Sequence, residues 1–420
     1  MAKIVVTTFV KNLLGGGAER VAVNLLQGLP RDVFTQELVM VDAWGPFLEQ
    51  VPEDVKQINL ALGHNVARAV PQLVRYLQRR KPDVLISHLA HANVAAVIAA
   101  ACARTGTKVI LIEHNDNSAV DRERTRSALS KAVQELKSLA YRRADKIVGV
   151  SEGVSDYVGE TFGVPTAKLE TIYNPVVSKA LLERSQQPLP HPWFAEGQPP
   201  VLLASGRLRE QKDFSTLLKA FAQLRQARTC RLMILGEGTL RPDLEAEVAA
   251  LGLQDDVALP GFVENPYAYM RGAAQFVLSS RWEGLPTVLV EAMACGCPVV
   301  ATDCPSGPAE ILENGRLGPL VEVANPGALA QAMLATLGAP TPRELLEDRA
   351  AHFSFENAIA SYTELLSGLA RPPGYAPRAK THLTTPLPSA QKRPSTPGTR
   401  ILHPIIRGLR RSKLKSREGR

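Results

Sequence analysis

Two glutamates, Glu283 and Glu291, lie in one short stretch of the chain with seven residues between them. The stretch reads S-S-R-W-E-G-L-P-T-V-L-V-E-A-M-A-C-G-C-P-V-V over residues 279–300. Carboxylates accept hydrogen bonds from hydroxyl groups, and free amides at a helix start hold anionic oxygens. A diphosphate there would have one acid on either side, with one glutamate on sugar hydroxyls and the other on the ribose. The arrangement suits a nucleotide sugar.

The order of residue types predicts the elements that hold the two acids. The apolar run 275–279 predicts a buried strand. Pro286, whose φ is preset for a first helical turn, predicts a helix that continues to Ala294. Gly296 and Pro298 are typical of a helix end.

Glu283 then lies in the loop before this helix and Glu291 inside it. Glu291 is roughly 8 Å along the axis from Pro286, at about 1.5 Å per residue. We expect the amides of Leu285 and Thr287 to point out of the helix start and to hold an anionic oxygen.

The whole stretch resembles the E-x7-E signature of retaining glycosyltransferases of family 4. It is most similar to bacterial members whose signature reads E-G-L-P-T-V-L-x-E-A-x-A-C-G. The resemblance covers about residues 1–368 and is most specific over 279–311. It implies donor binding by Glu283, Gly284, Leu285, Pro286, Thr287 and Glu291, and a catalytic role for Glu283.

Two further loops resemble segments of that family. Residues 14–20, L-G-G-G-A-E-R, are similar to its G-G-A-E-R loop, which implies that Gly16 and Gly17 lie beside the donor diphosphate. They do not form G-x-G-x-x-G, so a dinucleotide site is not favoured. Residues 206–212 resemble its G-R-L-x-x-x-K motif, which implies that Arg207 and Lys212 bind the diphosphate and stabilise the departing nucleoside diphosphate.

The remaining candidates are a glycine, a loop and two histidines. L-G-E-G over residues 235–238 and P-G-F-V over residues 260–263 also resemble segments of that family. The resemblance implies that Gly236 lets the backbone approach the nucleotide and that the main-chain groups of Phe262 and Val263 contact the base. His114 and His88 each follow a predicted strand, where α/β proteins bind ligands. The resemblance favours His114 as the catalytic histidine and leaves His88 between a functional and a structural role.

No metal or cofactor is expected. No D-x-D near the block pairs a carboxylate for a metal–diphosphate bridge, and Arg207 and Lys212 supply positive charge instead. The five cysteines form no even framework and no common zinc spacing, which indicates a reducing, cytosolic compartment and small buried packing residues.

Strands alternate with helices in both halves, which predicts parallel, doubly wound α/β sheets. With the resemblance, this predicts the GT-B fold: two facing Rossmann-like domains with a cleft between them. The expected domains are 1–180 for the acceptor, 198–350 for the nucleotide sugar, and 351–370 as a last helix crossing back to the first domain. A Pro- and Gln-rich linker is expected at 186–200.

Residues 371–420 form a basic tail that we expect to be disordered. They hold 13 of the 49 Lys and Arg residues and one of the 41 acids, which leaves 36 basic and 40 acidic residues, or −4, in the first 370. Residues 401–420 combine large apolar residues with cations, which suits an anionic inner-leaflet membrane surface. A solvated tail without a partner is equally compatible, and nucleic acid is less favoured because no aromatic residues interleave the charge.

The sequence therefore predicts a retaining glycosyltransferase that moves a hexose or N-acetylhexosamine from a nucleotide diphosphate sugar, UDP in the first instance, to an acceptor hydroxyl. The acceptor is expected to be a lipid-linked or surface-polysaccharide precursor in bacteria. No run approaches the ~20 apolar residues of a membrane span, so we expect a cytoplasmic protein, peripheral at most. The alternatives are a GT-B sugar-nucleotide epimerase and a non-catalytic nucleotide-sugar-binding protein.

Overall fold

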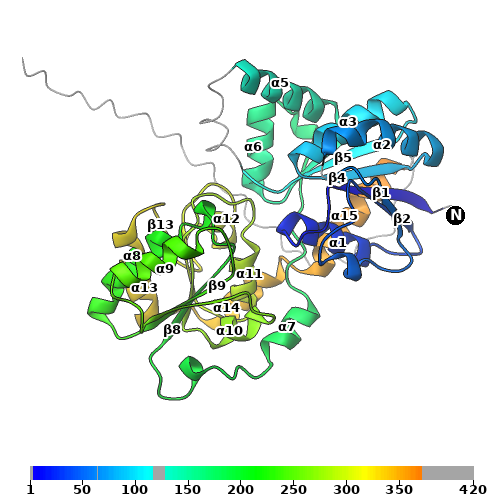
Figure 1. Cartoon of the computed structure of the whole chain (residues 1–420). Helices are drawn as coiled ribbons and strands as arrows, with labels where there is room; N and C mark the ends of the chain where they lie inside the picture. The colour runs from blue at the N-terminus through cyan, green and yellow to red at the C-terminus, as the bar shows by residue number, and fades with distance from the viewer. Residues whose placement is uncertain (1–2, 64, 117–127, 371–420) are drawn as a thin grey trace, which may run out of the picture. The chain divides into compact units, whose positions relative to one another are not determined.

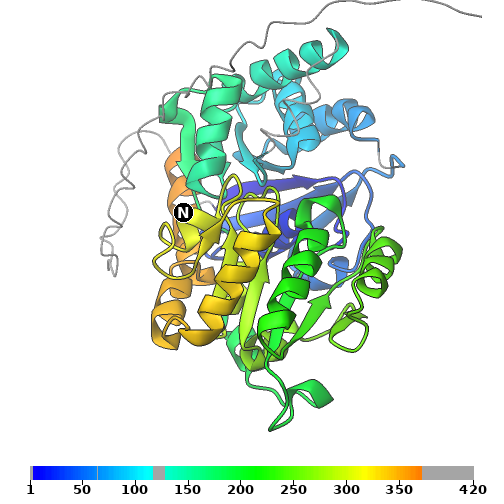
Figure 2. The same cartoon turned by 90° about the vertical axis from the view of Figure 1, so that its left-hand side faces the viewer.

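The computed structural model describes residues 3–63, 65–116 and 128–370. Over these ranges the chain forms two β-sheets whose strands all pair in parallel, with helices on both faces of each sheet (Figures 1 and 2). The predicted α/β class, with one doubly wound sheet in each half, is confirmed.

The first sheet lies in the N-terminal half, and its described strands have the order β3-β2-β1-β4-β5-β6-β7. Its elements are β1 (Ile4–Val10), α1 (Gly17–Gly28), β2 (Phe34–Met40), η1 (Leu48–Gln50), β3 (Lys56–Asn59), α2 (Val66–Arg80), β4 (Val84–His88), α3 (Ala90–Ala103), β5 (Lys108–Glu113), α5 (Ala128–Arg143), β6 (Lys146–Gly149), α6 (Glu152–Phe162), η2 (Thr166–Lys168) and β7 (Leu169–Thr171). The order reverses between β1 and β4, so ligands are expected beyond the carboxyl ends of these strands.

The second sheet follows α7 (Lys179–Ser185) and η3 (Pro192–Phe194), and its described strands have the order β10-β9-β8-β11-β12-β13. Its elements are β8 (Val201–Ser205), η4 (Glu210–Lys212), α8 (Phe214–Ala227), β9 (Arg231–Leu235), α9 (Arg241–Ala250), β10 (Val257–Gly261), α10 (Pro266–Gly272), β11 (Gln275–Leu278), α11 (Thr287–Ala294), β12 (Val299–Thr302), α12 (Pro308–Ile311), β13 (Leu320–Val321), α13 (Pro326–Gly338), α14 (Arg343–Ala351) and α15 (Phe355–Ala370). Here the order reverses between β8 and β11.

Successive residues of the central strands are apolar, and this is why helices cover both faces of each sheet. In β8, Leu202 and Ala204 pack in one cluster with helices α8 and α13, whereas Leu203 packs in another with α11 and α14. Alternation of side chains across the strand assigns each residue to its face.

The strand and the helix that the sequence predicts on either side of Glu283 are present as β11 and α11, with a difference at the helix start that has a local cause. Helix α11 begins at Thr287, because Pro286 has an extended ψ of 89° and serves as the N-cap, so the expectation that Pro286 is the first helical residue is wrong. The expected linker 186–200 contains the short helix η3, whose Phe194 packs edge-on against Tyr269 of α10.

The last helix, α15, packs against the first helix, α1. Ile359 and Leu366 of α15 lie in the same hydrophobic cluster as Leu25 and Leu29 of α1. The chain therefore returns to its N-terminal half after completing the second sheet. The predicted tail, residues 371–420, lies outside the described residues.

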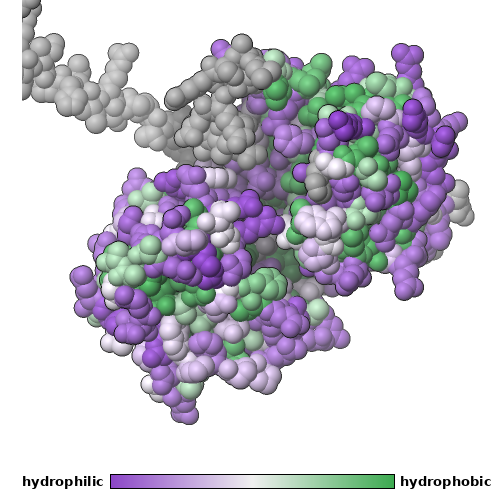
Figure 3. Space-filling view, viewed as in Figure 1, coloured by the Kyte–Doolittle hydropathy of each residue, from purple (hydrophilic) through white to green (hydrophobic). Residues whose placement is uncertain are grey.

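Hydrophilic residues cover much of the face shown in Figure 3, with groups of apolar residues between them. Among the helices that the structure describes, none has the length and apolarity needed to cross a membrane.

Gly28 tests the packing of α15 on α1. A Cβ at Gly28 would lie 2.5 Å from the Ile359 side chain and 2.7 Å from Phe355, so Gly28→Ala should destabilise the fold by about 1–3 kcal/mol through overpacking. In thermal or urea unfolding, Gly368→Ala is the matched control, because no atom lies within 4 Å of its Cβ position and alanine favours the helix interior. Equal stability of the two variants would contradict this packing.

Candidate active site

The two loops that follow β8 and β11 lie side by side and are joined by several hydrogen bonds and ion pairs. The Ser279 hydroxyl donates to the Lys212 carbonyl oxygen at 2.7 Å, and the Arg281 N–H donates to the Gln211 carbonyl oxygen at 2.8 Å. The Gln211 side-chain amide in turn donates to the Trp282 carbonyl oxygen at 2.9 Å. The two loops at the point where the strand order reverses are therefore held together by hydrogen bonds.

A further link between the two loops is an ion pair between two predicted site residues. Lys212 Nζ lies 2.5 Å from Glu283 Oε1, and the side chains are only 17% and 7% exposed. The same carboxylate oxygen accepts a hydrogen bond from the Ser280 hydroxyl at 2.6 Å. Sequence reasoning placed Lys212 on a diphosphate and Glu283 on a sugar. The structure holds the two charges together, one from each loop.

Glycines allow this close packing of loops. The methylene chain of Lys212 lies 3.1 Å from the Cβ position of Gly206. Gly236 has φ +128°, and a Cβ there would lie 2.1 Å from the Gly206 carbonyl oxygen. The close approach at Gly236 is thus made by the protein backbone, and a contact of Gly236 with a nucleotide stays a prediction.

Glu291 lies one turn inside α11, as the spacing predicted. Burial raises the pKa of its carboxyl group to about 7, and the nearby positive charge of Arg20 opposes the rise. Arg20 comes from α1, where its guanidinium stacks on the Phe47 ring at 3.8 Å and is half-buried. The second glutamate therefore faces a cation from the other half of the chain, and its ionisation is balanced near neutral pH.

The loop after β11 also contacts the N-terminal half directly. A Cβ at Gly284 would lie 1.9 Å from the His114 carbonyl oxygen, so only glycine fits there. The Ser151 hydroxyl donates to the Gly284 carbonyl oxygen at 2.8 Å, and the Asp116 N–H donates to the Glu283 carbonyl oxygen at 3.2 Å. These contacts set the backbone of the Glu283 loop against the ends of β5 and β6.

His114 and His88 lie together rather than in separate places. Their rings stack with centroids 5.3 Å apart, and His88 Nδ1 lies 3.1 Å from His114 Nε2. Burial lowers the pKa of His114 to about 3, and burial together with the neighbouring His114 lowers the pKa of His88 well below its usual value. Both imidazoles are therefore neutral near pH 7.

The glycine loop at the start of α1 approaches the second half through Arg207. The Arg207 Nη2 atom lies 3.2 Å from the position of a Cβ at Gly16, and a Cβ at Gly17 would have no atom within 4 Å. Gly16 is the N-cap of α1 and has no side-chain cap, so first-turn amides of the helix lack an intrahelical partner. The Arg207 side chain is exposed and lies opposite the start of α1.

The remaining predicted contacts are placed less centrally. Phe262 follows β10, and its side chain is 82% exposed, whereas Val263 packs against the core. Leu285 is buried, and Thr287 is the first residue of α11. Contacts of these residues with a nucleotide stay predictions.

The cysteines near the block are small buried residues, as expected. Cys295, Cys297 and Cys304 are at most 4% exposed, and burial raises the pKa of the Cys295 thiol to about 12. Within the described ranges, no group of three or more His, Cys, Asp or Glu side chains could hold a metal ion.

Three site residues were missed from the sequence. Ser280 lies in the stretch 279–300, three residues before Glu283, and Arg20 is the last residue of the glycine loop 14–20. The motifs could therefore have indicated both residues. Ser151 gave no signal, because its contact with Gly284 joins residues 133 positions apart.

Two family models match adjacent parts of this chain. The Glycosyltransferase Family 4 model matches residues 15–179, and the Glycosyl transferases group 1 model matches residues 199–338. They correspond to the two sheets and their helices.

Curated relatives and solved structures agree with these models. The N-acetylgalactosamine-N,N'-diacetylbacillosaminyl-diphospho-undecaprenol 4-alpha-N-acetylgalactosaminyltransferase of Campylobacter jejuni is 32% identical over 51% of this chain. The match spans 56% of that protein's own length. The amylovoran biosynthesis glycosyltransferase AmsD of Erwinia amylovora is 27% identical, over 71% of this chain and 80% of its own.

The HepE protein of Anabaena, solved in complex with UDP, superimposes with a TM-score of 0.70 at 21% identity, covering 87% of this chain and 100% of its own. This similarity shows the GT-B fold. The two family models indicate a Glycosyltransferase Family 4 domain over residues 15–179 and a Glycosyl transferases group 1 domain over residues 199–338.

Proposed function

We propose that this chain transfers a hexose or N-acetylhexosamine from a nucleoside diphosphate sugar, with UDP as the nucleotide, to an acceptor hydroxyl with retention of configuration. The observation that carries the proposal is the ion pair between Lys212 and Glu283 at the point where the strand order reverses. A diphosphate attracts the cation and sugar hydroxyls attract the carboxylate, so one donor molecule satisfies both partners.

The donor diphosphate is assigned to the space bounded by Lys212, Arg207 and the start of α11. Breaking the bond between the sugar and the phosphate leaves negative charge on the phosphate oxygen. Fixed cations there stabilise the transition state more than the bound donor, which lowers the barrier. The complex of HepE with UDP supports UDP as the nucleotide.

Retention of configuration is assigned to a front-face reaction. The acceptor oxygen attacks the anomeric carbon on the face from which the diphosphate leaves. The carbon–oxygen bond to the diphosphate breaks, and the acceptor proton passes to the departing diphosphate. Glu283 orients the sugar through its hydroxyl groups. The neutral His114 lies at the edge of this space as a hydrogen-bonding group.

The acceptor is assigned to a lipid-linked or surface-polysaccharide precursor, used at the cytoplasmic face of a membrane. The support is the relatives, whose names refer to a diphospho-undecaprenol acceptor and to amylovoran biosynthesis. The basic residues 401–420 would hold the enzyme at an anionic membrane surface.

Removing the Glu283 carboxylate should separate catalysis from binding. Glu283→Ala should lower turnover by about 10²-fold or more, because the sugar loses its orienting group, while UDP still binds to Lys212 and Arg207. Glu210→Ala removes an exposed carboxylate from the neighbouring loop and is the matched control. Donor hydrolysis and UDP titration give the two readouts; unchanged turnover in Glu283→Ala would refute the role of this residue.

Donor affinity should depend on pH through Glu291. Its pKa of about 7 means that the carboxylate loses its charge as the pH falls through neutrality. If the ionised form holds the ribose hydroxyls, the donor KM should rise about tenfold between pH 8 and pH 6. Glu291→Gln should remove this dependence, and Arg20→Gln should move the midpoint upward. A donor KM with the same pH profile in wild type and Glu291→Gln would exclude the assignment.

The reaction should not need a metal ion, because Arg207, Lys212 and the helix start supply the positive charge. Transfer measured in excess chelator should therefore keep its full rate. A loss of activity that added Mg²⁺ or Mn²⁺ restores would overturn this prediction.

A further inference from the structure

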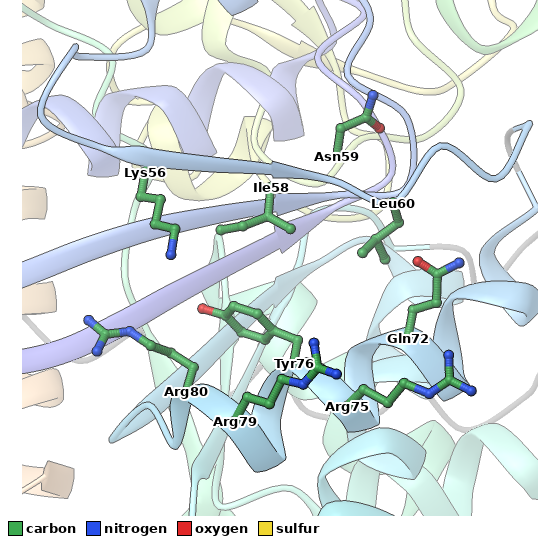
Figure 4. Close-up of a pocket in the computed structure, with 9 residues that line it drawn as sticks. All are labelled: Lys56, Ile58, Asn59, Leu60, Gln72, Arg75, Tyr76, Arg79 and Arg80. Carbon is green, nitrogen blue, oxygen red and sulfur yellow. The ribbon is translucent and has the colours of Figure 1, made fainter.

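A pocket of about 580 Å³ lies between strand β3 and helix α2, in the N-terminal half (Figure 4). Lys56 and Ile58 point from the strand toward the helix, and Tyr76 points from the helix toward the strand. Arg75 and Arg79 of α2 complete the cationic rim. No acidic residue lines the pocket.

Only one of the arginines that line the pocket is neutralised by a partner. Arg80 Nε lies 2.7 Å from Glu37 Oε1, and the Tyr76 hydroxyl donates to the same carboxylate. The side chains of Lys56, Arg75 and Arg79 form no ion pair or hydrogen bond with any residue that the structure describes. The pocket therefore presents three uncompensated cations around an apolar and aromatic floor.

The stability of the fold does not explain this convergence of charge. Arg79 and Arg80 lie in the last turn of α2, where cations interact favourably with the helix dipole. The helix dipole does not account for Arg75, which lies before the last turn, and Lys56 lies on a different element. Arg75 and Arg79 are four residues apart on one helix, a spacing at which like charges destabilise.

The pocket is separate from the candidate active site. Strand β3 is at the edge of its sheet, and β2, β1 and β4 lie between it and β5. At about 4.8 Å per strand, β3 lies roughly 19 Å from β5, which leads into His114. Lys56 begins β3 and Arg79 nearly ends α2, so the cations lie toward the amino ends of the strands, whereas the active-site loops follow the carboxyl ends.

We propose that this pocket is a second anion-binding site, which takes a phosphate-bearing ligand. Guanidinium groups match phosphate oxygens with two parallel hydrogen bonds, so Arg75 and Arg79 are the primary contacts and Lys56 adds a point charge. Ile58 and Tyr76 face the carbon atoms of the ligand. Either a soluble phosphorylated compound or an anionic lipid headgroup supplies this chemistry.

The test compares two double variants of the full chain. Arg75→Gln/Arg79→Gln removes two cations from the pocket. Arg68→Gln/Lys81→Gln removes two cations from the same helix region outside it. Both variants keep Arg207, Lys212 and the basic tail, so binding of anions at those places affects both equally. Unchanged circular dichroism and thermal unfolding establish that each variant folds.

Inorganic diphosphate is titrated by calorimetry, and phosphatidylglycerol vesicles are tested by co-sedimentation against neutral vesicles. The pocket variant should bind at least one of these probes about tenfold more weakly than the wild type, whereas the control variant stays close to it. Loss for diphosphate identifies a soluble ligand, and loss for vesicles alone identifies a lipid headgroup. Equal binding by the two variants, or no binding by the wild type, overturns the proposal.

Discussion

A nearly buried ion pair between Lys212 and Glu283 organises the second half of this chain. Removing one partner of such a pair leaves an uncompensated charge and typically costs about 3–5 kcal/mol. The loops after β8 and β11 therefore have to stay in register, and the Ser280 hydroxyl holds the carboxylate while Gly206 leaves room for the lysine chain. Because both loops follow central strands, the sheet determines the position of the ion pair.

A second constraint follows from the first, because the backbone of the Glu283 loop also meets the N-terminal half. Gly284 leaves no space for a Cβ beside the His114 carbonyl oxygen, and Ser151 binds the Gly284 carbonyl. The ion-paired loop is thus in direct contact with the backbone of His114. Arg20 opposite Glu291 makes a similar link from α1 to α11. In the proposed function, these contacts join the acids that bind the donor to the loop that carries His114.

The sequence predicted the helices and strands whose residue patterns lie within one short segment of the chain. Apolar runs such as 201–205 and 231–235 form strands, in keeping with the predicted alternation of strands and helices, and proline and glycine mark the ends of α11. Short polar edge strands such as β3 were missed, since K-Q-I-N has no apolar alternation. The pairing of Lys212 with Glu283, residues 71 positions apart, and the stacking of His88 on His114 could not be predicted, because only tertiary packing brings them together.

The most direct test is a structure of the protein with an unreactive UDP-sugar analogue, in which the distance from Lys212 Nζ to Glu283 Oε1 is measured. The account predicts that this distance increases from 2.5 Å to beyond about 4 Å, the limit of an ion pair, with Lys212 on the diphosphate and Glu283 on sugar hydroxyls. An intact ion pair, with the analogue bound elsewhere or contacting neither residue, would contradict it.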